Sequence, residues 1–174
     1  ILGLDSLIVN NENCHLDLKV HEPNTVGADR ICNVIATIKI YNKPAIVIDF
    51  GTATTYDVIN KNGQFIGGII APGIKTSSQY LIEKAALLDY VDFEFPEKVI
   101  GKNTEDNIKS GIMFGAIDQI EGMIKRINNE TKQNNNIILT GGFSKLISPK
   151  ISLEHTCDID LTLKGMILIH ESNN

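Results

Sequence analysis

The sequence predicts an α/β fold that opens with three antiparallel strands. Three short apolar or β-branched runs follow one another between residues 45 and 70, separated only by a few turn-forming residues. Helical periodicity then dominates, interrupted by one short apolar run at residues 137–140. Consecutive strands followed by helices and a late strand are typical of an α/β domain, and 174 residues suffice for one such domain and a fragment of another.

The composition excludes several classes of protein. Hydrophobic residues make up 43% of the chain and charged residues 21%, and no apolar run approaches the roughly 18 residues of a membrane span. The net charge of −5 offers no positive field to nucleic acid or to an anionic membrane. The three cysteines Cys14, Cys32 and Cys157 are widely spaced, which argues against a disulfide framework and a zinc site. We therefore expect a cytoplasmic protein with neither a nucleic-acid nor a membrane partner.

Two different patterns precede the first predicted strand. Apolar stretches at residues 7–9 and 16–20 are expected to form strands separated by turns. From Asp29 to Ile38 apolar residues recur at helical spacing, and Pro44 follows soon after, which predicts a helix of about three turns. The chain begins at Ile1 without a targeting signal, and we expect it to be truncated at its N-terminus.

The remaining elements follow in order. Strands are predicted at residues 45–50, 54–59 and 65–70, with Asn62-Gly63 as a favourable hairpin turn. A helix is expected around residues 80–88, a long one at 105–128, a buried strand at 137–140 and a closing helix at 161–170. Thr104 stands at the N-cap position of the long helix. The buried face of that helix is expected to carry Ile108, Ile112, Gly115, Ile120, Met123 and Ile127.

The strongest functional signal is the run DFGTATT at residues 49–55, between the first two strands. A turn containing Gly51 lets backbone N–H groups approach an anion, and threonines such as Thr52 add hydroxyl donors without charge. Asp49 would supply the negative charge that holds a cation beside phosphates. The alternative is a threonine-rich hairpin that is simply good β sequence.

A second signal, GADR at residues 27–30, lies at the start of the first predicted helix. Asp29 can be an ordinary carboxylate at a helix N-terminus, and Arg30 a surface residue. An acid next to a guanidinium can also place a general base beside an anion-binding fork.

Paired glycines form weaker signals. They occur at Gly67-Gly68, before Pro72-Gly73, and again at Gly141-Gly142. Such pairs usually mark tight turns, but they also leave room for a flat base or a ribose against the backbone.

Taken in order, GADR, DFGTATT, GGIIAPG, GKNT and TGG resemble the type III pantothenate kinases over residues from about 16 to 170. The resemblance implies the superfamily of acetate and sugar kinases, heat-shock proteins and actin, whose members place two ribonuclease-H-like domains across a nucleotide cleft. Residues 43–174 would be the second ribonuclease-H-like domain and residues 1–42 the C-terminal remnant of the first.

The resemblance also implies an activity, namely ATP-dependent phosphorylation of pantothenate to 4'-phosphopantothenate, the first step of coenzyme A biosynthesis. The implied cofactors are ATP, magnesium and potassium or ammonium, and the implied assembly is a homodimer. Asp29 would be the catalytic base, and Asp49 the ligand of the monovalent cation. The implied pantothenate site consists of Gly27, Ala28, Asp29, Arg30 and Thr104, with Arg30 facing the substrate carboxylate. The implied nucleotide site consists of Gly51, Thr52, Gly141 and Gly142.

The sequence departs from this family in three places. The D-x-G-N-T loop that binds phosphate and magnesium in the family is missing, so we expect this fragment alone to be inactive. Val20 stands near a position where many members carry a substrate-contacting tyrosine, and Tyr56 stands where phenylalanine is frequent.

Other functions compete with the kinase. One is a non-catalytic nucleotide-binding regulatory or accessory protein of the same fold, although such a protein has no need of Asp29. Another is a related kinase or phosphatase for a different small molecule, against which the GADR run argues. The spacing of Gly111 and Gly115 on the long helix fits either core packing or a dimer contact.

Overall fold

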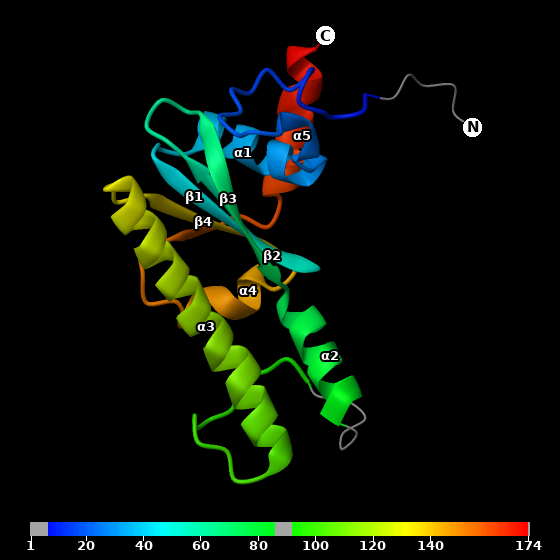
Figure 1. The fold of residues 1–174 in the computed structure, drawn as a ribbon, viewed down its shortest axis with the longest axis vertical. Coiled ribbons are helices and arrows are strands. Elements are labelled where there is room, and N and C mark those ends of the chain that lie inside the picture. Colours follow the sequence, from blue (N-terminus) through cyan, green and yellow to red (C-terminus); the bar gives the residue numbers. More distant parts are fainter. Residues whose placement is uncertain (1–6, 86–91, 174) are drawn as a thin grey trace, which may run out of the picture.

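The computed structural model describes residues 7–85 and 92–173, and Figure 1 shows their arrangement. The helices are η1 (Pro23–Thr25, a 3-10 turn), α1 (Ala28–Ile40), α2 (Ile74–Ala85), α3 (Thr104–Thr131), α4 (Ser144–Ile147), η2 (Ser148–Lys150, also 3-10) and α5 (Leu161–Ser172). The strands are β1 (Ala45–Phe50), β2 (Ala53–Ile59), β3 (Phe65–Pro72), β4 (Asn136–Gly141) and β5 (Thr156–Cys157).

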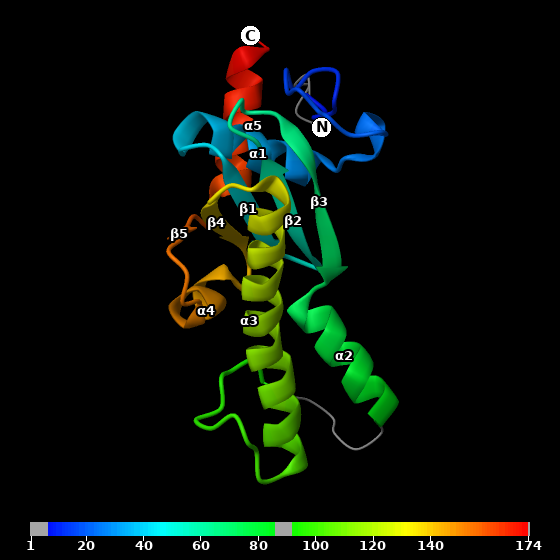
Figure 2. The same ribbon diagram turned by 60° about the vertical axis from the view of Figure 1, so that its left-hand side comes forward.

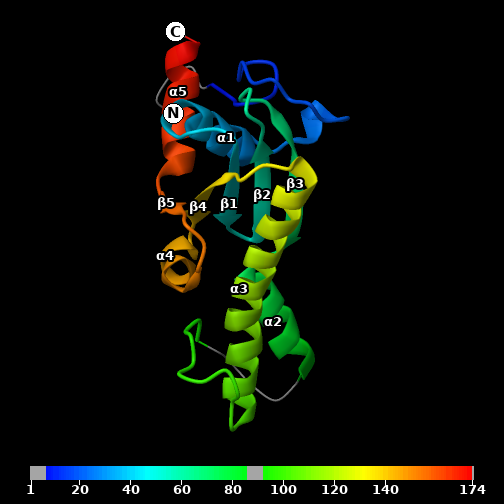
Figure 3. The ribbon, with the colours of Figure 1, turned by 90° about the vertical axis from the view of Figure 1, so that its left-hand side faces the viewer.

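The strands form one mixed sheet in the order β3-β2-β1-β4-β5, which can be followed across Figure 3. β1, β2 and β3 pair antiparallel as the predicted meander, whereas β4 pairs parallel to β1 and β5 parallel to β4. Helices α1 and α5 pack together on one side of the sheet, and the long helix α3 lies on the other (Figures 1 and 2). The central strand β1 is therefore covered on both faces.

Alternation along β1 explains how its continuous apolar run serves two cores. Ile46, Ile48 and Phe50 face the core formed with α3. Ala45 and Val47 face the core beneath α1 and α5. Since successive side chains of a strand point to opposite faces, Asp49 shares the α1 side with Val47.

Helix α3 begins and packs differently from its prediction. Its N-cap is Asn103, whose Oδ1 accepts the Asp106 backbone N–H at 2.8 Å, and Thr104 is the first helical residue. Its buried face is made of Lys109, Ser110, Met113, Ile117, Ile120, Ile124 and Ile127. The buried face of α3 is thus rotated about the helix axis relative to the prediction, and Ile108 and Ile112 are only partly buried.

The glycines of α3 do not serve packing within this chain. A Cβ atom built on Gly111 or on Gly115 would meet no heavy atom within 4 Å. Both glycines line an open groove of about 440 Å³ between α3 and α2, together with Ile74 and Leu81. The core-packing interpretation of their spacing is therefore wrong for the described residues.

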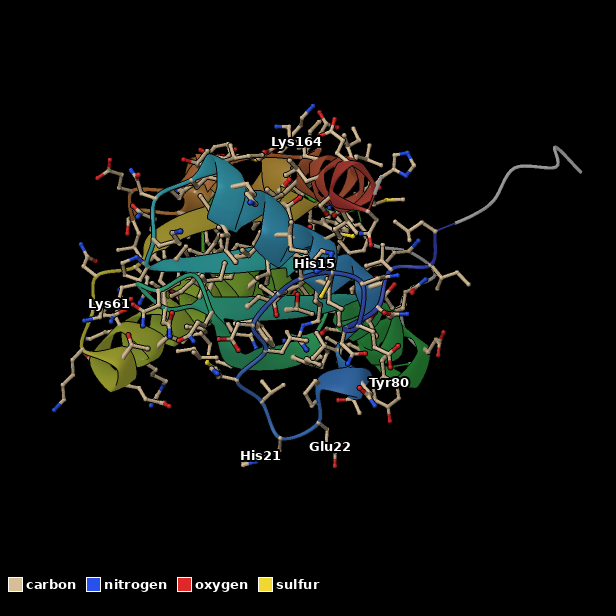
Figure 4. All side chains as sticks on the ribbon, turned by 90° about the horizontal axis from the view of Figure 1, so that it is seen from above. His15, His21, Glu22, Lys61, Tyr80 and Lys164 are labelled. Atoms are coloured by element: carbon tan, nitrogen blue, oxygen red, sulfur yellow. The ribbon has the colours of Figure 1, made fainter. Side chains whose placement is uncertain are left out.

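The segment before α1 is not strand-like, contrary to the prediction. Within the described part of residues 7–26, the only strand-type backbone pairing with the sheet is a single parallel bridge between Leu18 and Phe65. Asparagine side chains organise the preceding turn, where Asn10 Oδ1 accepts the Asn13 backbone N–H. Figure 4 shows His21 and Glu22 at the tip of a loop that points away from the sheet.

Helix α1 is anchored to α5 by a close approach and by a polar cluster. Gly165 of α5 faces the backbone of Cys32, where any Cβ atom would collide with the Cys32 carbonyl. At the other end of α1, Asp158 accepts hydrogen bonds from Tyr41 Oη at 2.8 Å and from Lys164 Nζ at 2.7 Å. The division of the chain at residue 42 stays a prediction, although α1 packs on the same sheet as the later elements.

Two further outcomes concern the C-terminal half. Helix α2 begins at Ile74, earlier than expected, and the predicted position Leu88 lies outside the described residues. α4 and β5 were not predicted, because four helical residues and two strand residues carry too little periodicity to be recognised.

Candidate functional site

The candidate site lies where the start of α1 meets the end of β1. Asp29 and Arg30 belong to the first turn of α1, and Asp49 is the penultimate residue of β1. The electrostatic influence of Asp29 reaches both Asp49 and Asp57 of β2, so the three carboxylates share one neighbourhood. The structure thus brings together the two motifs that stood about twenty residues apart.

Asp29 folds back onto its own helix. Its Oδ1 accepts the Arg30 backbone N–H at 2.8 Å, and the side chain remains exposed. A negative charge at this position is favoured by the helix dipole. A Cβ atom at Gly27 would lie 2.6 Å from Asp29 Oδ1, so a side chain there would require the exposed Asp29 carboxylate to move. Ala28, the first residue of α1, is exposed beside it.

Asp49 is held by a chain of hydrogen bonds that joins three elements. Its Oδ2 accepts Asn33 Nδ2–H at 2.8 Å, and Asn33 Oδ1 in turn accepts the hydroxyl of Thr162 in α5 at 2.7 Å. Burial raises the pKa of Asp49, the Asn33 hydrogen bond lowers it, and the charge of Asp29 raises it. The net direction is upward, so Asp49 is a desolvated carboxylate with a fixed orientation.

Two buried hydroxyls flank Asp49 across the sheet. Thr55 of β2 and Thr140 of β4 are its partners in the two strand pairings, and such partners project from the same face. Both Oγ1 atoms are buried without a hydrogen-bond partner among the described residues. Buried polar atoms in native proteins are normally satisfied. The Asp49 carboxylate and the two threonine hydroxyls therefore form a row of three oxygen groups that are free to act as metal ligands. Such oxygen ligands suit a hard cation such as potassium.

Arg30 has an internal partner. Its Nε and Nη2 atoms lie 2.7 and 2.5 Å from Oδ1 of the fully buried Asp57. Burial raises the pKa of Asp57 to about 6, even though the Arg30 charge and hydrogen bond lower it. The Arg30 guanidinium also stands over the Phe65 ring, 5.4 Å from its centroid.

Backbone groups of the hairpin turn after β1 already have hydrogen-bond partners within the protein, which differs from the predicted phosphate-binding turn. The Gly51 backbone N–H donates to Ala53 O at 3.0 Å, so this N–H is already engaged in the turn. The Thr52 carbonyl accepts Thr76 Oγ1–H at 2.7 Å and Gly73 N–H at 3.1 Å, while the Thr52 side chain is exposed. Of the threonines in the run, Thr55 faces Asp49, whereas Thr54 pairs with Phe50 and lines the groove beside α2.

The glycine pairs mostly make room for protein atoms. A Cβ atom on Gly68 would collide with the Tyr56 carbonyl and approach Arg30 Nη2 to 2.7 Å. One on Gly73 would strike the backbone of the turn at Gly51. Gly141 has a φ of +88°, and its missing side chain leaves space for Asp49 Oδ1. Gly142 is exposed, with the nearest atom to a built Cβ at 4.0 Å.

The structure places Thr104 on α3, apart from the helix that carries Asp29 and Arg30. Thr104 begins α3 at the bottom of Figure 1, whereas α1 lies in the upper half. α3 covers the face of the sheet opposite to α1, and Ile108, one turn after Thr104, lines the groove beside Phe50 and Thr54. Val20 packs against the core beneath α1, next to Phe65.

Sequence reasoning missed Asn33, Asp57, Thr140 and Thr162. Asn33 and Asp57 are polar residues inside otherwise apolar stretches, which is a recognisable signal because a buried polar side chain requires a partner. Thr140 stood in the predicted strand and in the TGG run, but no role beside Asp49 was predicted for it. Thr162 gave no signal, since its role depends on the packing of α5 against α1.

This sheet order, with helices on both faces and carboxylates at the end of its central strand, defines a ribonuclease-H-like domain of the actin-like ATPase class. The sequence profile of the type III pantothenate kinases matches residues 1–126. The chain therefore belongs to the type III pantothenate kinase family, and both the predicted family and the predicted fold class are confirmed.

Solved structures agree with this fold. A Campylobacter jejuni protein described as a Baf family transcriptional activator has a TM-score of 0.65 and 23% identity, with 95% of this chain and 72% of that chain covered. The activator of 2-hydroxyisocaproyl-CoA dehydratase from Clostridium difficile, solved with bound ADPNP, has a TM-score of 0.50 and 14% identity. That alignment covers 82% of this chain and 66% of the activator. In the part of the chain that the structure describes, no helix is both long and apolar enough to cross a bilayer.

Proposed function

We propose that this protein transfers a phosphoryl group from ATP to pantothenate. The observation that carries the proposal is the meeting of Asp29, Arg30 and Asp49 at one end of the sheet in a member of this family. We also propose that activity requires the family's D-x-G-N-T segment, which this sequence lacks.

Asp29 is suited to be the base. It is exposed to an incoming hydroxyl, and its hydrogen bond to the Arg30 backbone leaves Oδ2 available. Phosphoryl transfer passes through a loose transition state, so positioning and electrostatics supply most of the rate. A base that accepts the hydroxyl proton late need contribute only about 10²- to 10⁴-fold.

The donors around Asp49 support a monovalent cation site. Asp49 contributes a charge, and Thr55 and Thr140 contribute hydroxyl oxygens that lack other partners among the described residues. When bound, potassium would supply positive charge beside the nucleotide phosphates. Magnesium is commonly held through one or two carboxylates and the substrate phosphates themselves. No group of three or more acidic, histidine or cysteine residues that could hold a metal occurs in residues 7–85 and 92–173.

The distance of Thr104 bears on the proposed dimer. Thr104 begins α3, which covers the opposite face of the sheet from α1 and its Asp29. If Thr104 contacts pantothenate, it does so from a second copy. A homodimer in which each α3 start approaches the partner's α1 is therefore part of this proposal.

A coupled assay of ADP release tests the activity. Pantothenate, ATP, magnesium and potassium are supplied to this chain and to a version carrying the family's N-terminal D-x-G-N-T strand and loop. We expect pantothenate-dependent ADP release only from the version with that segment. Silence of both proteins, together with retained binding of a non-hydrolysable ATP analogue, would favour the non-catalytic regulator instead.

A further inference from the structure

We propose that Asp57 is the positioning residue that aims Arg30 at the carboxylate of pantothenate. The inference rests on the proposed function and adds a residue that lies outside the GADR motif. Asp57 would act through Arg30 and would not itself touch the substrate.

The geometry of the ion pair is one-sided. Both Arg30 contacts, from Nε and from Nη2, end on Oδ1 of Asp57. Arginine carries five N–H donors in a planar fork. The two that face Asp57 lie along one edge of the guanidinium, so the donors of the other edge remain for a second anion. A bidentate pair with a carboxylate needs just one such edge.

Three surfaces leave Arg30 little freedom. Asp57 fixes one edge, the Phe65 ring lies under the plane, and Gly68 gives the Nη2 atom space that any Cβ would occupy. The Arg30 side chain is 15% exposed, so part of it still reaches solvent. Ordering a free arginine on binding costs side-chain entropy. An arginine already held in place avoids this cost when the substrate arrives.

The arrangement also links the Arg30 guanidinium to the proposed base, Asp29. Arg30 follows Asp29 directly, and its backbone N–H holds the Asp29 carboxylate. Fixing the Arg30 side chain therefore fixes the anion-binding edge relative to the base. Pantothenate carries its carboxylate at one end and its reacting hydroxyl at the other, so anchoring the first orients the second.

The pair is not arranged for stability alone. Asp57 is 0% exposed, and its Oδ2 has no hydrogen-bond partner among the residues that the structure describes. A buried carboxylate with one unsatisfied oxygen is costly. Such a pair is weak evidence for a gain in stability, because replacing both partners by well-packed apolar residues is often neutral or stabilising. The orientation of Arg30 gives this pair a functional reason.

The test compares pantothenate with its neutral amide in the protein that contains the D-x-G-N-T segment. Asp57→Asn should raise KM and the calorimetric Kd for pantothenate by about 10- to 100-fold, because a hydrogen bond to a charged group is weakened. We expect kcat to change less than about 3-fold. Neither constant for the amide should change by more than about 3-fold, since the amide has no carboxylate to be oriented.

Asp158→Asn is the matched control. Asp158 is also a buried, ion-paired aspartate that contacts α1, but at the opposite end of that helix. Its replacement should affect stability without separating the two substrates. Equal changes for pantothenate and the amide in Asp57→Asn, or no change for either, would overturn the inference.

A second variant decides the matter if Asp57→Asn does not fold. Phe65→Leu removes the ring beneath the guanidinium while keeping an apolar residue in the core, and should raise KM for pantothenate alone by about 3- to 10-fold. An unselective effect would contradict the inference. If the unmodified protein binds neither pantothenate nor the amide, the proposed function itself fails, and this inference fails with it.

Discussion

Asp29 combines a structural contact with its proposed chemical role, and the two can be separated. Asparagine keeps an oxygen for the Arg30 backbone N–H but cannot accept a proton. We expect Asp29→Asn to lower kcat by about 10²- to 10⁴-fold while the affinity for ATP changes less than about 3-fold. Steady-state kinetics and calorimetry with an ATP analogue measure the two quantities. Undiminished kcat would exclude Asp29 as the base.

Adjacent glycines at the end of β4 provide a matched pair. Gly141 has a φ of +88° and lies against Asp49, whereas Gly142 has open space around it. Gly141→Ala should lower the free energy of unfolding by more than about 1 kcal/mol, because it combines backbone strain with a collision. Gly142→Ala should change it by no more than about 0.5 kcal/mol. Urea denaturation checks both, and equal values would contradict the geometry.

At the scale of single elements, two neighbouring residues at the start of α3 have different roles: one caps the helix and the other is the proposed substrate contact. Asn103 caps the helix through its side chain, whereas Thr104 has no such bond. Asn103→Ala should cost about 1 kcal/mol of stability. Thr104→Ala should leave stability nearly unchanged and, on our proposal, raise KM for pantothenate. A larger stability loss for Thr104→Ala than for Asn103→Ala would mean that the cap is wrongly placed.

The contact between α1, β1 and α5 depends on one amide. Asn33 is fully buried and bonds to both Asp49 and Thr162. Asn33→Leu leaves Asp49 Oδ2 without this donor, so we expect it to cost about 1–3 kcal/mol and to weaken the dependence of the rate on potassium. Thr37→Val is the control, since the Thr37 hydroxyl bonds only to the Asn33 carbonyl of its own helix. An equal change in potassium dependence would refute a specific role for Asn33.

At the scale of the whole molecule, Asp57 should give stability a measurable pH dependence. Burial raises its pKa from 3.8 to about 6, so between these values the folded protein holds a proton that the unfolded chain has lost. This contribution to stability is complete below pH 3.8 and is lost as the pH rises through about 6. A pKa change of this size corresponds to about 3 kcal/mol.

Comparison with Asp57→Asn isolates that contribution, because asparagine does not titrate. The free energy of unfolding of the variant, minus that of the unmodified protein, should become more positive by up to about 3 kcal/mol between pH 4 and pH 7. Chemical denaturation at several pH values measures the difference. Parallel curves for the two proteins would show that Asp57 has the same pKa in both states.

Local patterns in the sequence were sufficient for most of the elements. The helix from Ala28 and the three strands of the meander appear where periodicity placed them, because apolar spacing reflects which faces are buried. The family could also be predicted, since Gly27, Asp29 and Asp49 stand in two short runs, GADR and DFGTATT, that can be recognised without knowledge of the fold. The close contact that a side chain at Gly27 would make is with Asp29, only two residues away.

Only the tertiary structure decided which distant residues complete the site. The hydrogen-bond chain that ends on Asp49 runs from Thr162 of α5 through Asn33 of α1, and the hydroxyls that flank Asp49 come from β2 and β4. Arg30 meets Asp57 across 27 positions of sequence. The chain's pattern fixed the helical and strand periods, which depend on neighbours within a turn or two. Strand order, helix rotation and the placement of α3 on the face opposite to α1 depend on long-range packing, which no local spacing encodes.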